Sequence, residues 1–372
     1  MRVKLCLAAL LLFSAIGLNA QKDNNRYWDS GPLTWGDYTQ SSAITEDGSG
    51  SSNSFGWETK DAHEEYGNLT VHRVVSKVYL NKAQSWVNPT LATDRQLRYN
   101  QLFFDLNELY CRRMLREIYD PDTNFDVGFV QDYYIGLVAV KMTEINTMSD
   151  HGTDEATVAY FDTVVQSQLE ALPRSEFKPA NLKKGTHGFG MRGGLTGEFF
   201  MGKPAASLGT VYMMDFGLRY YYNRFFVDAG FGIGALKARD DISTPRINLY
   251  KGQILSDIQA NGFVGFNLYD GSWVRIAPMA GIGYNGVSLL DTDDEDEITP
   301  MALSGLRIMA GLDFDLKTTR EAFLFPEDRS LSESCLNFRV YLAKTGFNAG
   351  LDGLTLNVGI SYSLQYFGLK GW

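Results

Sequence analysis

The C-terminal half of the chain alternates apolar residues with small or polar ones at a period of two. From Leu354 to Tyr366, every even position is apolar and every odd position is Thr, Asn, Gly, Ser or Gln. Because successive side chains of a strand point to opposite faces, this strand has one apolar and one polar face. Soluble sandwiches also alternate, but they turn roughly every 8–12 residues. Longer strands with a polar inner face and an aromatic outer face predict an antiparallel barrel that spans a bilayer.

Eight segments follow this rule, and an even number is what single-chain bacterial membrane barrels require. The second, third, fifth, sixth and seventh show the alternation clearly, whereas the first and fourth follow it less cleanly. We expect strands near residues 187–201, 208–222, 225–238, 253–269, 272–288, 302–317, 335–346 and 352–367.

Charged residues on the predicted inner face nearly cancel, with five positive and six negative side chains. Eight strands leave a lumen that side chains just fill. Unpaired charge there would be very costly, so these groups are expected to pair and form a polar plug. This disfavours a diffusion pore, and a narrow passive channel remains an alternative. The predicted lumen charges are Arg192, Glu198, Asp215, Arg219, Asp228, Asp257, Arg275, Arg307, Asp313, Asp315 and Arg339.

The connections between the strands alternate in length. Tight links are expected at 222–224 and 269–271, and longer polar ones at 239–252 and 289–301. Short turns face the periplasm in such barrels, so the preceding half of the chain is expected there too. The connection at 318–334 departs from this pattern, because it is long where a short turn is due. An acidic run at 291–297 is expected to be a solvated outer loop, with weak cation binding as the alternative.

The strand pattern and the aromatic-rich closing strand resemble the small outer-membrane barrels of the OmpA/OmpX kind, especially those common in Bacteroidetes. The resemblance covers about half of the chain and implies an outer-membrane location with membrane lipids as partners. It also implies a terminal aromatic residue that the assembly machinery reads, for which Phe367 and Trp372 are the candidates.

Residues 1–20 have the features of a secretory signal. Arg2 and Lys4 are followed by an apolar stretch and a small-residue cleavage site before Gln21. The stretch is too short to span a bilayer as a helix.

The net charge of −10 argues against a nucleic-acid partner. Cys111 and Cys335 fall in different predicted domains and are expected to be unpaired thiols.

The N-terminal half has a different character and predicts an α+β domain over residues 21–180, joined by a linker at 181–186 to the barrel at 187–372. We expect β structure over 71–86, helices over 97–119 and 153–172, and a helix or a strand pair over 127–147. The polar segment from His63 to Gly67 is expected to be a solvated loop.

Several short motifs in this half resemble a bacterial family of zinc-dependent peptidases with an HExxH motif. The segment 32–38, PLTWGDY, resembles the opening of that family, and 85–87, SWV, its next landmark. The family's helix HEQxHFD, with its ELYARxLR-like continuation, matches here at Gln101, Phe104, Asp105, Glu108 and Leu109.

The residues that such a peptidase needs are absent from the matching helix. Two His at i and i+4 bind Zn²⁺ and the Glu between them acts as the general base. In this chain these positions are Tyr99, Phe103 and Asn100. His151 is a weak metal candidate, since one His cannot hold a catalytic zinc alone. The resemblance therefore implies a domain that kept its scaffold, lost its site and needs no cofactor.

The sequence as a whole predicts an outer-membrane barrel that anchors a non-catalytic periplasmic domain. Its role would be structural or partner-binding within the envelope. Two alternatives remain open at this point: a metal-dependent hydrolase with a noncanonical site, and a narrow passive channel.

Overall fold

The structure is a computed structural model that describes residues 24–45, 50–120, 122–123, 125–174, 177–243, 248–289, 303–347 and 352–371. The chain divides into two compact units. Within the described ranges, the first unit holds residues up to 62, from 73 to 174 and 325–327. The second holds 63–72, 177–324 and the chain from 328. The predicted signal (1–20), the acidic run (291–297) and Trp372 lie outside the described residues.

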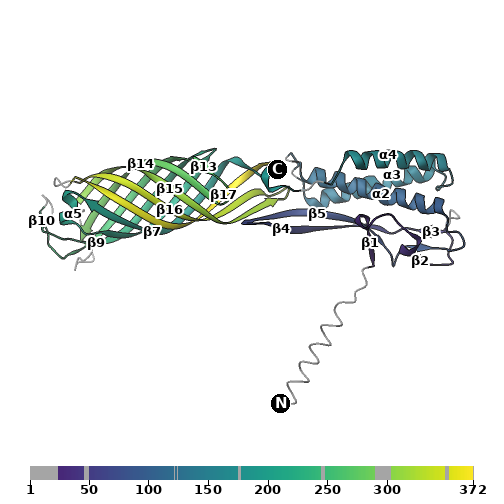
Figure 1. Ribbon diagram of the computed structural model, residues 1–372, viewed down its shortest axis with the longest axis horizontal. Coiled ribbons are helices and arrows are strands. Elements are labelled where there is room, and N and C mark those ends of the chain that lie inside the picture. The colour runs from purple at the N-terminus through teal and green to yellow at the C-terminus, as the bar shows by residue number, and fades with distance from the viewer. Residues whose placement is uncertain are drawn as a thin grey trace, which may run out of the picture. The chain divides into compact units, whose positions relative to one another are not determined.

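The first unit combines short strands, most of a long hairpin and three helices (Figure 1). Its elements are β1 (Asn25–Tyr27), β2 (Thr39–Gln40), β3 (Ser51–Ser52), β4 (Phe55–Tyr66), β5 (Leu69–Asn81), β6 (Trp86–Val87), α2 (Asp94–Ile118), α3 (Val127–Met148) and α4 (Glu155–Ala171), with 3-10 turns η1 (Trp28–Ser30) and η2 (Trp35–Asp37).

Each of the three helices begins at a side-chain cap. Thr93 accepts a hydrogen bond from the backbone N–H of Gln96, which starts α2 a turn earlier than the apolar periodicity indicates. Asp126 and Asp154 cap α3 and α4 in the same way, and the segment 127–147 is therefore a helix and not a strand pair. Within the described residues, no helix is both long and apolar enough to cross a membrane.

Aromatic side chains of β4 fix the first unit's hairpin against α2. Phe55 stacks on Phe104 with ring centroids 5.5 Å apart, and Trp57 donates a hydrogen bond from Nε1 to Oδ1 of Asn107 at 3.1 Å. The sequence did not indicate β4, and the expected loop at 63–67 is wrong because His63 to Tyr66 form its end. Its charged residues obscure the alternation.

The second unit is dominated by an eight-stranded antiparallel barrel (Figure 1). The strands pair in the order β15-β16-β17-β7-β8-β9-β12-β14, and β14 pairs back to β15, so the sheet closes on itself. Its strands are β7 (Lys183–Met201), β8 (Val211–Tyr222), β9 (Phe225–Lys237), β12 (Ile254–Phe266), β14 (Val274–Leu289), β15 (Leu303–Leu324), β16 (Arg329–Phe347) and β17 (Gly353–Gly371). Smaller elements are η3 (Pro179–Asn181), α5 (Lys203–Ser207), β10 (Ile242–Ser243), β11 (Asn248–Leu249) and β13 (Tyr269–Asp270).

Strands β15 and β16 are much longer than the sequence pattern indicates. They pair from Gly305↔Phe347 to Leu324↔Arg329, so only residues 325–328 connect them. The expected long connection at 318–334 is therefore wrong, and the alternation of short and long connections holds here. The end of β15 is stabilised by parallel pairing with β5, from Arg320↔Leu69 to Phe323↔His72.

One further difference concerns the start of the barrel. Residues 183–186 of the expected linker belong to β7, where Lys183 pairs with Gly371 and Lys184 with Leu369. The short connections at 223–224, 267–273 and 325–328 share one end of the barrel with the start of β7 and the end of β17.

Candidate functional site

The barrel lumen holds a dense set of ion pairs, which begins near the short connections at Glu333. This fully buried carboxylate contacts Nζ of Lys184 at 2.8 Å, Nζ of Lys317 at 3.1 Å, Nε of Arg320 at 3.1 Å and Nη2 of Arg275 at 2.5 Å. Four cations around one carboxylate leave excess positive charge, which two further carboxylates offset. One is Asp270, which is partly exposed and contacts Lys184, Lys317 and Arg275, and the other is the buried Asp315, which lies 3.0 Å from Arg275.

A second cluster is centred on Asp228 of β9. Its carboxylate, 0% exposed, contacts Arg192 at 3.1 Å, Arg219 at 3.0 Å and Arg339 at 3.1 Å. Asp313 also pairs with Arg219 and Arg339, and Asp215 pairs with Arg192. Three carboxylates thus neutralise three guanidinium groups from different strands.

The third charged group lies toward the other end of β7. Arg307 pairs with Glu198 at 3.1 Å, and Nε2 of Gln259 donates a hydrogen bond to the same carboxylate at 2.5 Å. Asp257 is 1% exposed and forms no ion pair with any described residue. Its charge is the one in this group that has no direct cation partner.

Glycines make room for the largest of these side chains. A Cβ atom on Gly217 or Gly230 would lie 2.8 Å or 2.7 Å from the guanidinium of Arg192. The cavity between Arg192, Arg219 and Tyr221 has a volume of only about 10 Å³, which is at most the space of one water molecule. The lumen at this level is filled with paired charge.

All eleven charges expected in the lumen lie on barrel strands, and ten of them have an opposite charge within 4.0 Å. Sequence reasoning missed Lys184, Asp270, Lys317, Arg320 and Glu333. The alternation of Arg339, Asn337, Cys335 and Glu333 along β16 carries the signal for Glu333. The surrounding Ser-rich run, which resembles a loop, obscures this signal.

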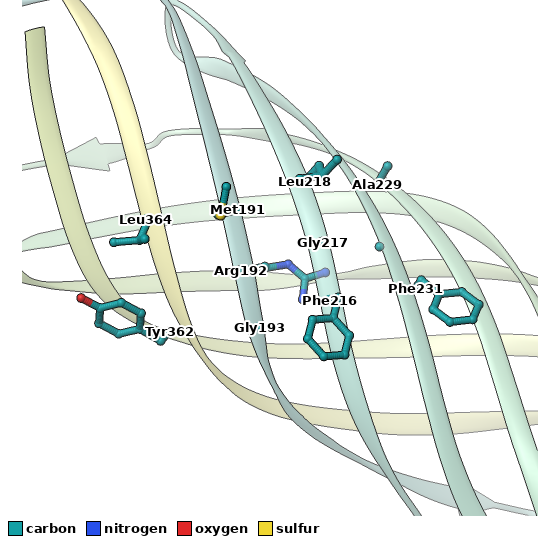
Figure 2. A pocket seen from close by; sticks show the side chains of 11 residues that line it. Met191, Arg192, Gly193, Phe216, Gly217, Leu218, Ala229, Phe231, Tyr362 and Leu364 are labelled. Carbon is teal, nitrogen blue, oxygen red and sulfur yellow. The ribbon is translucent and has the colours of Figure 1, made fainter.

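The outer surface of the barrel is apolar. Leu306 and Ile282 are 74% and 72% exposed, and most outward positions carry large aliphatic or aromatic side chains. Figure 2 shows where this surface is hollowed, over β17, β7, β8 and β9. Gly193 and Ala229 are the smallest outward residues there and lie among larger side chains such as Phe216.

In the first unit, the helix positions that would carry a peptidase site are occupied by aromatic and amide side chains. Tyr99 and Phe103 share one face of α2, with ring centroids 4.6 Å apart. Tyr99 also donates a hydrogen bond to Oδ1 of Asn146 at 2.5 Å. Asn100 accepts one from Asn53 at 3.0 Å. None of these groups supplies an imidazole or a general base.

The residues that match the peptidase frame have structural contacts. Gln101 accepts a hydrogen bond from the backbone N–H of Leu33 at 2.7 Å, which ties the PLTW segment to α2. Asp105 accepts hydrogen bonds from Trp28 at 2.7 Å, Gln101 at 2.8 Å and Gln166 at 2.7 Å. Burial nevertheless raises the pKa of Asp105 above its usual value, against the effect of these hydrogen bonds.

Glu108 of the same frame is fully buried and pairs with two arginines. Arg112 contacts it at 2.7 Å from the next turn of α2, and Arg174 contacts it at 2.6 Å from beyond the end of α4. The carboxylate therefore holds the end of α4 to α2, which is a positioning role within the fold.

The weak metal candidate His151 lies in the exposed turn between α3 and α4, with a φ of 56°. Among the residues that the structure describes, no three or more His, Cys, Asp or Glu side chains gather as a metal site would require.

Cys111 and Cys335 are both buried and free. Burial raises the pKa of the Cys111 thiol to about 12, so this thiol is unreactive at neutral pH.

A closed eight-stranded antiparallel barrel with an apolar exterior and a charged, filled interior is the class of fold that these features define. No family model and no curated protein matches the chain. Solved structures that resemble it are outer-membrane barrels: Neisserial surface protein A (10% identity, TM-score 0.31), OprG of Pseudomonas aeruginosa (10%, 0.28) and Ail of Yersinia pestis (9%, 0.29). The matches cover 49%, 51% and 49% of this chain and 96%, 98% and 99% of those proteins. The barrel assignment rests on the closure and register of its own strands.

Proposed function

We propose that this protein is an outer-membrane barrel that anchors a non-catalytic α+β domain in the periplasm, where that domain binds a protein of the envelope. The proposal is supported above all by the two faces of the barrel. Its outer face is apolar, and the charged side chains of its inner face form ion pairs. In water, such a continuous apolar surface would be unfavourable by about 25 cal/mol for each Å². In a bilayer, the same surface is matched by lipid.

The direction of the barrel follows from its connections. The short turns share one end with the start of β7 and the end of β17. Short turns face the periplasm in bacterial barrels. The chain that precedes β7 would then emerge on the periplasmic side.

A partner-binding role is supported by α3. This helix buries only Val130, Val138 and Ile145, while Phe129, Tyr133 and Val140 on its other side are 60%, 58% and 69% exposed. Only Asp132, Lys141 and Glu144 on this helix are charged. An apolar stripe with so few charges fits the apolar surface of another envelope protein.

The absence of catalysis is proposed from α2. Tyr99, Asn100 and Phe103 cannot bind zinc or activate water, and they are held by packing and hydrogen bonds. Elemental analysis of the purified, untagged protein tests this part. A stoichiometric amount of zinc would contradict it and favour a hydrolase.

The membrane part of the proposal is tested by fractionation and by gel mobility. The full chain is expected in the outer-membrane fraction, resistant to extraction by high salt. It should migrate faster in an unheated gel sample than in a boiled one, because the closed barrel survives detergent. A chain that fractionates as soluble and shows no such shift would refute the anchor.

The partner role is tested by site-specific photo-crosslinking in intact envelopes. A crosslinking residue at Tyr133 is expected to capture one discrete protein, and one at Glu170, an exposed position of α4, is the matched control. Equal capture at both positions, or none at Tyr133, would exclude α3 as the contact surface.

A further inference from the structure

The outward residues of β17, β7, β8 and β9 form rows across the barrel wall, and two rows have a gap. One row places Gly193 between Tyr362 and Phe216. The next row ends in Ala229, which is paired with Leu218. Figure 2 shows both rows, with Gly193 and Ala229 set among larger outward side chains. The outer surface of the barrel is therefore recessed at these two positions.

Two hollows of about 700 Å³ and 640 Å³ result from these gaps. They share Met191, Leu218, Ala229 and Leu364, so they form one continuous outer groove. Arg192, Arg219 and Gln365 border it from strand positions whose side chains are buried in the lumen. Apart from these three and Ser332, the residues that line it are glycine, apolar or aromatic.

One end of the groove is polar and lies toward the short connections. There, the hydroxyl of Tyr220 is 2.5 Å from Nδ1 of His187, and the hydroxyl of Tyr366 donates to Asp328 at 3.1 Å. Aromatic residues with polar tips mark the boundary between the apolar band of a barrel and the headgroup region. The groove thus runs from that boundary toward the middle of the wall.

The length of the groove matches one leaflet. From Tyr362 to Tyr366 the strand advances four residues, which is roughly 13 Å along the strand at about 3.3 Å per residue. For a strand tilt of about 40° this is about 10 Å along the membrane normal. The apolar band of such barrels is about 25 Å tall, so one leaflet contributes about 12 Å. A transmembrane partner would need a surface that continues across both leaflets, whereas an acyl chain needs only one.

From this geometry we infer that the groove binds one acyl chain of a glycerophospholipid in the leaflet at the short-turn end of the barrel. The inference rests on the proposed membrane location. The chain lies over Gly193 and Ala229 between the flanking aromatic rings, and the headgroup lies beside Tyr220 and His187. Contact with these rings as well as with the strands beneath holds this lipid more strongly than the lipids on the convex remainder of the wall.

The experiment is native mass spectrometry of the full, untagged chain, released from mild detergent after delipidation. Wild type is expected to retain one phospholipid. Ala229→Phe fills the groove and should lower the retained fraction at least about tenfold, because methylenes displaced from the wall lose their contacts. Ala310→Phe adds the same ring at an outward position of β15, away from the groove, and should leave retention unchanged.

Gly193→Leu is a second test in case Ala229→Phe fails to fold. A Cβ at Gly193 meets Phe216 at an ordinary 3.5 Å, so this variant is expected to fold and to lose the lipid. Retention equal to wild type in folded Ala229→Phe or Gly193→Leu would overturn the inference, as would complete lipid loss from wild type. So would a second protein chain that is bound in wild type and lost in the variants. A protein absent from the membrane fraction would instead refute the proposed function.

Discussion

Asp228 is the residue on which the pairing of charge in the lumen depends most. It contacts Arg192, Arg219 and Arg339, which come from three different strands. Removing one member of a buried ion pair leaves the other charge without compensation, which is more costly than the pair is stabilising. Asp257 is buried to the same extent but has no ion pair among the described residues.

This contrast predicts that replacing Asp by Asn has different effects on stability at the two positions. Asp228→Asn should lower the free energy of unfolding by about 3–5 kcal/mol, since three arginines lose their shared carboxylate. Asp257→Asn removes a buried charge that has no direct cation partner and should be neutral or stabilising. The measurement is the urea midpoint of the barrel in detergent, read from heat-modifiable mobility. Equal destabilisation by both substitutions would contradict the charge arrangement described above.

Asp105 predicts a pH dependence in the first unit. Burial raises its pKa above the ordinary value of an aspartate, so the folded state binds this proton more tightly than the unfolded state does. The stabilisation from Asp105 is therefore present below about pH 4 and is lost as the pH rises through the raised pKa.

Asp105→Asn removes this titration while keeping one oxygen acceptor for Trp28 and Gln101. Between pH 4 and neutral pH, the free energy of unfolding should fall more for wild type than for the variant. Urea unfolding of the full chain, followed by tryptophan fluorescence, measures the difference. Parallel pH profiles would show that Asp105 does not titrate differently on folding.

At the scale of elements, the barrel strands depend on close approach at inward glycines. A Cβ on Gly311 of β15 would lie 2.2 Å from the carbonyl oxygen of Val340 on β16. Backbone atoms cannot move aside as a flexible side chain can, so the two strands must separate to admit even a methyl group.

Gly311→Ala is therefore expected to destabilise the barrel by about 1–3 kcal/mol through overpacking. Ala310→Val, at the adjacent exposed position, should change stability by less than about 0.5 kcal/mol. The folded fraction on unheated gels across a urea series measures both. An unaffected Gly311→Ala barrel would show that β15 and β16 are further apart than the register implies.

At the scale of the whole molecule, the filled lumen predicts that the protein does not conduct. The clusters around Glu333, Asp228 and Glu198 follow one another along the barrel, and the cavity beside Arg192 is about 10 Å³. In planar bilayers, purified full-length protein should give no steady single-channel conductance. Discrete, stable openings would favour the narrow channel instead and would mean that the ion pairs separate in the membrane.

Sequence reasoning located the eight barrel strands because each carries its own alternation, as in Leu354–Tyr366. It shortened β15 and β16 because Pro326 and the polar, Ser-rich residues that follow it resemble a loop. In the structure, the end of β15 is paired with β5 instead. It missed β4, whose charged residues resemble a loop. The alternation along each strand identified the eleven charged residues that point into the lumen. It did not identify their ion-pair partners, because those depend on the register and shear of the strands.

The sequence by itself determined that this chain forms a strand-rich barrel with an apolar outer face. The alternation of apolar and polar residues can be read within each strand alone. Only the tertiary structure decided which charged groups pair, how far the strands extend and where the outer surface is recessed, at Gly193 and Ala229. Those features arise between strands far apart in sequence. Closure of the sheet brings Asp228 to Arg339 and Gly193 to Tyr362, and no local pattern encodes which neighbour that closure supplies.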